Sequence, residues 1–165
     1  MSIGFRRNLT RSAVCFLVWT ALGLFMSSQG LAQKAFSRDP TPWWHYTLSW
    51  LVGVWCWWLM TPVVLWLGNR VPLERRHLIR RIALHLVLAP VVGLTQLALE
   101  ASIIRSLHLF PTIMVSFAAT FGFLLVIAFQ QTILTYATIL GVQYAYRWYE
   151  RYQERRQEAL RLQLR

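Results

Sequence analysis

Charged residues are scarce in this sequence, and acidic residues are the scarcest. Only six of the 165 residues are acidic and 14% are charged, whereas 56% are hydrophobic. Soluble domains carry about 25% charged residues, so the composition disfavours a soluble globular fold. The 17 basic residues give a net charge of +11, but they form clusters between long uncharged runs. This arrangement is typical of membrane topology, and we predict the lipid bilayer as a partner and no nucleic acid.

Residue patterns with catalytic or metal-binding chemistry are also missing. Cys15 and Cys56 both lie in apolar runs, which indicates neither a disulfide framework nor a metal cluster. No two of the four histidines stand three or four residues apart, the spacing that would direct both at one metal from a helix. The eight glycines form no phosphate-binding loop, and no Ser, His and acid grouping stands out. We predict no catalytic residue, no cofactor and no metal within this chain.

Long uncharged runs predict four membrane helices. Each run reaches the roughly 20 residues that a spanning helix needs. The runs cover residues 12–33, 40–69, 82–104 and 112–146, with a polar loop at 33–42. The second run holds seven of the nine tryptophans, and Trp43, Trp44 and Trp66 lie near its ends, where indoles prefer the headgroup region. The sequence therefore predicts an all-α membrane protein with four transmembrane helices.

The first run has two interpretations. It is longer than the ~7 to 15 residue core of a signal peptide, which favours an uncleaved anchor. Gly30 and Ala32, however, are small residues at the right positions for a cut before Gln33. N-terminal sequencing of the purified membrane form would separate the two.

Two prolines and one acid interrupt the apolar helices. Pro62 and Pro90 each remove a backbone donor, so we predict kinks there. Glu100 lies about 27 Å along a helix that starts at Ile82, close to the far interface of a ~30 Å hydrocarbon core. A hydrated interfacial carboxylate is the simpler interpretation of Glu100. A buried sensor or proton-binding carboxylate is the sharper one, because ionisable groups in membrane spans are often functional.

The fourth run is too long for one perpendicular crossing, yet neither of its glycines is flanked by polar turn residues. We predict one helix that leaves the bilayer near residues 136–141 and continues as a cytoplasmic helix. Ala137, Gly141 and Ala145 form a small-residue stripe suited to close helix contact, so we predict a homodimer. A second, polar stripe could hydrogen-bond another helix, and it consists of Gln131, Thr135 and Thr138.

The charged tail has a pattern that approximates a heptad seam, interrupted by Arg155. The seam consists of Ala145, Trp148, Tyr152, Ala159 and Leu162. A parallel dimeric linker and a solvated or interfacial basic helix fit this pattern equally well.

The distribution of basic residues predicts the topology. Fourteen of the 17 lie before the first run, between the second and third runs, or in the tail. The positive-inside rule then places both termini in the cytoplasm. We divide the chain into a cytoplasmic N-terminus at 1–11, a four-helix transmembrane sensor domain at 12–142 and a cytoplasmic helical, coiled-coil-like linker at 143–165.

Two motifs carry a resemblance to a known family. They are Met-Thr-Pro-Val-Val-Leu-Trp-Leu at residues 60–67 and Val-Pro-Leu-Glu-Arg-Arg at residues 71–76. With His85 downstream, they resemble the membrane region of the LytS/AlgZ-like sensor histidine kinases of bacterial two-component systems. The tail from Tyr144 resembles that family's linker towards the phosphoacceptor. The resemblance implies a multi-pass protein of the bacterial cytoplasmic membrane. The family's Pro-His-Phe-x-Phe-Asn box and ATP-binding domain do not occur in these 165 residues, so no catalytic residue is transferred.

The first functional hypothesis is therefore the input module of a sensor histidine kinase, with the kinase domain expected in cis after Arg165 and a response regulator reached only through it. The alternative is a stand-alone membrane interaction or scaffold protein whose arginines bind a partner or anionic lipid. A transport subunit is the weakest hypothesis, since only Pro62, Pro90 and Glu100 support it and internal repeats are absent. Whether the reading frame continues past Arg165 into a phosphoacceptor box separates the first two.

Overall fold

The computed structural model describes residues 3–37, 41–72, 78–110 and 116–163. Within these ranges, all secondary structure is helical. The helices are α1 (Ile3–Ser37), α2 (Trp43–Arg70), α3 (Leu78–Ser106) and α4 (Phe117–Gln163). All four are long and apolar enough to cross a membrane. The predicted all-α fold with four candidate membrane spans, the last running on as a charged helix, is confirmed.

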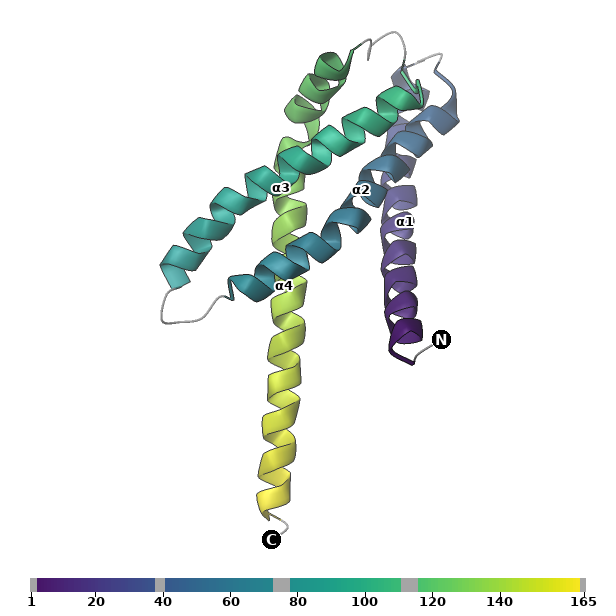
Figure 1. Cartoon of the computed structure of the whole chain (residues 1–165). Helices are drawn as coiled ribbons and strands as arrows, with labels where there is room; N and C mark the ends of the chain where they lie inside the picture. Colours follow the sequence, from purple (N-terminus) through teal and green to yellow (C-terminus); the bar gives the residue numbers. More distant parts are fainter. Residues whose placement is uncertain (1–2, 38–40, 73–77, 111–115, 164–165) are drawn as a thin grey trace.

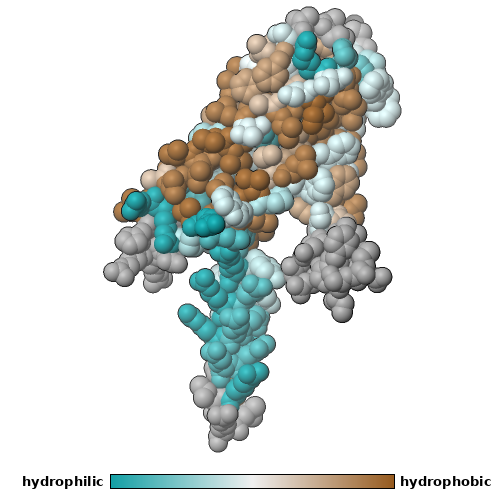
Figure 2. Space-filling model, in the orientation of Figure 1, coloured by the Kyte–Doolittle hydropathy of each residue, from teal (hydrophilic) through white to brown (hydrophobic). Residues whose placement is uncertain are grey.

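The helices alternate in direction, so the two ends of the chain lie on the same side of the helical body (Figure 1). The start of α1, the end of α2 and the start of α3 lie towards this side, and the second half of α4 projects beyond them. Hydrophobic residues cover the helical body, whereas the projecting part of α4 is hydrophilic (Figure 2). At ~1.5 Å per residue α4 is about 70 Å long, more than twice a ~30 Å hydrocarbon core.

Several helix ends differ from the sequence-based expectation. Residues 33–37, predicted to begin a loop, are the last residues of α1. They include Lys34 and Ala35, which are good helix formers, and the first proline comes only at position 40. The start of α3, expected at Ile82, lies at Leu78. Residues 38–40, 73–77 and 111–115, which hold much of the predicted loops and the expected start of the fourth helix, lie outside the described residues.

Helix α1 packs on α2 alone, while α2, α3 and α4 all contact one another. Two tryptophans of α2 make polar contacts with α1. The Trp55 indole donates to the Thr20 hydroxyl over 3.1 Å, and the Trp58 indole donates to the Ser12 carbonyl over 3.3 Å. In the other direction, the Trp19 indole donates to the Thr61 hydroxyl. These tryptophans thus serve interhelical packing.

Two hydrophobic clusters hold α2, α3 and α4 together. One contains Val52, Cys56, Leu97, Ala101, Ile104, Leu109 and Leu124. The other contains Trp57, Val64, Ala89, Val92, Tyr136 and Leu140. Close approach of α3 and α4 requires a glycine at position 93, because a Cβ there would lie 2.4 Å from the Thr132 hydroxyl oxygen. The second cluster lies beside the polar contacts described next.

Candidate functional site

The end of α2 presents carbonyl groups that its own helix cannot satisfy, because the last turn of any helix leaves its acceptors without partners. The Val71 carbonyl receives two hydrogen bonds from other helices. His85 Nε2 in α3 lies 3.0 Å from it, and the Tyr144 hydroxyl in α4 donates to it over 3.2 Å. One carbonyl group therefore joins three helices.

His85 connects this carbonyl to a second position on α4. Its Nδ1 lies 2.9 Å from the Tyr136 hydroxyl, and both side chains are buried, Tyr136 to 1% exposure. A carbonyl can only accept, so Nε2 carries a proton. In the neutral imidazole Nδ1 is then an acceptor, and the Tyr136 hydroxyl donates to it. The structure thus defines the tautomer of the neutral His85 ring.

A third polar contact binds α2 to α4 directly. The Gln143 amide nitrogen donates to the Leu65 carbonyl over 3.0 Å and to the Asn69 side-chain oxygen over 2.8 Å. Gly68 makes room for it, because a Cβ there would lie 2.2 Å from Gln143 Oε1. We call the set Val71, His85, Tyr136, Gln143 and Tyr144 the interhelix lock. It includes Val71, the first residue of the second motif that carries the family resemblance, and His85 downstream of that motif.

Arginine 81 adds to the attachment of the segment after α2. Its guanidinium donates to the Pro72 carbonyl, one residue beyond the carbonyl that His85 contacts. Arg81 and His85 are four residues apart and so lie on one face of α3. The resemblance named His85 without giving it a role, and the structure places it at the centre of the interhelix lock.

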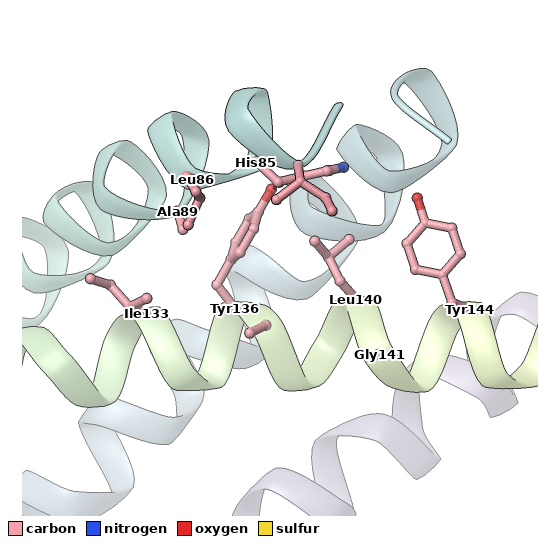
Figure 3. A pocket seen from close by; sticks show the side chains of 10 residues that line it. His85, Leu86, Ala89, Ile133, Tyr136, Leu140, Gly141 and Tyr144 are labelled. Atoms are coloured by element: carbon pink, nitrogen blue, oxygen red, sulfur yellow. Dashed lines mark hydrogen bonds between the residues drawn. The ribbon is translucent and has the colours of Figure 1, made fainter. Parts of the chain in front are cut away.

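An open groove of about 280 Å³ lies between α3 and α4 beside the interhelix lock (Figure 3). Leu86, Ala89 and Ile133 make much of its apolar lining, and Tyr136 and Tyr144 stand along it. Ala137 and Gly141 belong to the lining as well. The groove has no cluster of acidic or metal-binding side chains, so its chemistry fits an apolar contact.

The small-residue stripe faces outwards. Ala137, Gly141 and Ala145 are all exposed, and a Cβ added at Gly141 would meet nothing within 4 Å. None of the three belongs to either hydrophobic cluster. Their role in helix contact between copies stays a prediction, and the side chains of Ala159 and Leu162, further along the predicted seam, lie outside what the structure describes.

Both predicted kink positions lie inside continuous helices, Pro62 in α2 and Pro90 in α3. Next to Pro62, the Thr61 hydroxyl donates to the Trp57 carbonyl over 2.7 Å. Proline has no backbone N–H, so one hydrogen bond of the helix is missing in this turn. The Thr61 hydroxyl adds a side-chain donor in the same turn. The kinks themselves stay predictions.

Glu100 lies at the contact between α3 and α2. The amide of Gln96, only 1% exposed, donates to one carboxylate oxygen over 2.7 Å. On α2, Gly53 allows the approach, since a Cβ there would lie 3.0 Å from Glu100 Oε1. These contacts direct the carboxylate towards the neighbouring helix, and its role as a sensor stays a prediction.

Within the described residues, no three His, Cys, Asp or Glu side chains are grouped to hold a metal ion. Cys15 and Cys56 are both free thiols. Comparison with protein-family models, with curated proteins and with solved structures found no match. The proposals below therefore depend on the sequence motifs and on the contacts described above.

Proposed function

We propose that this chain is the membrane-embedded input module of a two-component signalling histidine kinase. Helix α4 would carry a stimulus received in the bilayer to a kinase core expected after Arg165, in the cytoplasmic membrane of a bacterium with both termini in the cytoplasm. One observation carries the proposal. α4 is a single 47-residue helix that belongs to the helical body at one end and projects as a charged rod at the other.

The interhelix lock lies where α4 leaves the apolar body. Tyr136, Gln143 and Tyr144 are spread over two turns of α4, and they bond to α3 and to the end of α2. A rearrangement of α2 against α3 would change the partners of all three. Because a helix is stiff along its axis, such a change would reach the tail as a rotation or a shift. In this proposal the interhelix lock is the element that switches between two arrangements.

The tail exposes aromatic side chains that a single helix in water cannot bury. Trp148 is 69% exposed and Tyr152 is 52% exposed, and their rings stack on each other at 5.7 Å. They lie on the same helix face as Gly141 and Ala145, because these positions are separated by three or four residues. A second copy of α4 would cover this face, which supports the proposed homodimer.

Cysteines introduced at Gly141 and Ala145 should form disulfide-linked dimers in membranes, in a background in which Cys15 and Cys56 are replaced by alanine. Cysteine at Val142, an exposed position about 100° round the helix from Gly141, is the matched control and should crosslink far less. Absence of crosslinked product at both Gly141 and Ala145 would count against the dimer.

The coupling to a kinase has a separate test. The reading frame past Arg165 should encode the Pro-His-Phe-x-Phe-Asn box and an ATP-binding domain, and the complete protein should autophosphorylate on that histidine. A stop codon directly after Arg165 would instead favour the stand-alone membrane interaction protein.

A further inference from the structure

Gln130 places a carboxamide on the lipid-facing side of α4. The side chain is exposed, and it makes no hydrogen bond to any part of the chain that the structure describes. It lies ~20 Å along the helix from Phe117 and ~17 Å before Gly141, close to the middle of a bilayer. An unpaired amide in hydrocarbon costs about 4 to 8 kcal/mol relative to water. Gln130 therefore needs a polar partner at its own depth.

The surroundings of Gln130 form a helix-contact face. At ~100° per residue, Ile127, Leu134, Ala137 and Gly141 share its side of α4. They follow one another at intervals of three or four residues, which is the spacing of a seam between two parallel helices. All are exposed, Ile127 to 54% and Leu134 to 60%. This intramembrane seam continues into the face of Trp148 and Tyr152.

A second copy of the chain fits this seam better than any helix of the same chain. Helix α1, the one peripheral helix, packs on α2 alone among the described contacts. In a parallel pair with two-fold symmetry, each residue meets its own equivalent at the same depth. A carboxamide is self-complementary, since it both donates and accepts. A charged partner side chain would satisfy only the donor or only the acceptor of the amide, and an apolar partner would satisfy neither.

We propose that two copies pair through α4 inside the bilayer, and that the Gln130 side chains of the two copies hydrogen-bond to each other across the seam. This inference rests on the homodimer of the proposed function and assigns its polar clamp. The small residues Ala137 and Gly141, about two and three turns further on, allow the two backbones to approach. The clamp fixes the register of α4 within the membrane and hence that of the tail.

The test measures dimerisation of the full chain in liposomes by energy transfer between labelled copies, over a range of protein-to-lipid ratios. Gln130→Leu should weaken dimerisation by about 3-fold to 20-fold, which corresponds to the roughly 0.6 to 1.7 kcal/mol of interhelical polar bonds in membranes. Gln130→Asn, which keeps the amide, should retain part of the effect. Gln131→Leu is the matched comparison, because Gln131 is also an exposed amide but lies ~100° away from the seam, and it should weaken dimerisation far less than Gln130→Leu.

The outcomes separate the clamp from the dimer. If the unmodified chain shows no dimer at any ratio, the proposed pairing itself is overturned. If the chain dimerises and Gln130→Leu has no effect, the clamp is wrong while the pairing stands. An equal loss in Gln130→Leu and Gln131→Leu would overturn the assigned face. A loss confined to position 130, partly restored by asparagine, supports the proposal.

Discussion

Inserting two residues into α4 after Tyr149 should change kinase output about tenfold or more in the complete protein that the proposal expects, a size within the usual range of coupling between sites. Two residues rotate everything downstream by about 200° and therefore turn the tail seam to the opposite side. Duplicating Glu150 and Arg151 provides this insertion without altering helix propensity or net charge. The readout is autophosphorylation at a fixed ATP concentration.

A seven-residue insertion is the matched control for this experiment. Duplicating residues 150–156 lengthens the rod by ~10 Å but restores the face to within about 20°, so output should stay close to that of the parent. Equal output from all three proteins would show that the kinase ignores the register of α4. Equal loss with both insertions would point to general disruption of the tail and would also contradict transmission by register.

Replacing His85 by leucine should lower the free energy of unfolding by about 2 to 4 kcal/mol, because two hydrogen bonds are lost, one of them buried, and a buried group left unpaired costs about 1 to 3 kcal/mol. The Tyr136 hydroxyl loses its acceptor, whereas the Val71 carbonyl keeps the Tyr144 hydroxyl. Reversible unfolding in mixed micelles gives the free energy directly.

A double variant separates the hydrogen bond from packing. Adding Tyr136→Phe to His85→Leu removes the stranded hydroxyl, and an apolar pair of similar shape can be nearly neutral. The double variant should therefore be more stable than His85→Leu alone, by about 1 kcal/mol or more. Strictly additive losses would mean that His85 and Tyr136 do not act as a bonded pair.

The architecture followed from patterns local in sequence. Uncharged runs, proline positions and the missing turn between Gly122 and Gly141 were enough to predict four spans and a single long last helix. The same local reasoning misplaced some helix ends by several residues. Lys34 and Ala35, for example, are good helix formers within the segment that was predicted as a loop. The four-residue period placed Ala137, Gly141 and Ala145 on one face of the last helix, and the structure shows that this face is exposed.

The interhelix lock could not be predicted in this way. His85 and Tyr136 are 51 residues apart, and Gln143 and Leu65 are 78 apart. Which polar groups meet depends on where α2, α3 and α4 cross, and the hydrophobic pattern leaves that crossing open. One signal was present in the sequence: Gln143 and Tyr144 are polar residues at the point where the last helix leaves its apolar run. Glu100 was similarly ambiguous, because only the crossing with α2 brings Gly53 against it.

The central claim is that the interhelix lock sets the position of the tail. The distance between the end of α2 and the tail can be measured within a single chain by pulsed electron paramagnetic resonance. The spin labels are placed at Arg70, at the end of α2, and at Arg156, in the tail. Labelled chains are diluted with unlabelled ones in lipid nanodiscs. The intact chain should give a narrow distance distribution, and His85→Leu combined with Tyr144→Phe should broaden or shift it. An unchanged distribution in that double variant would contradict the claim.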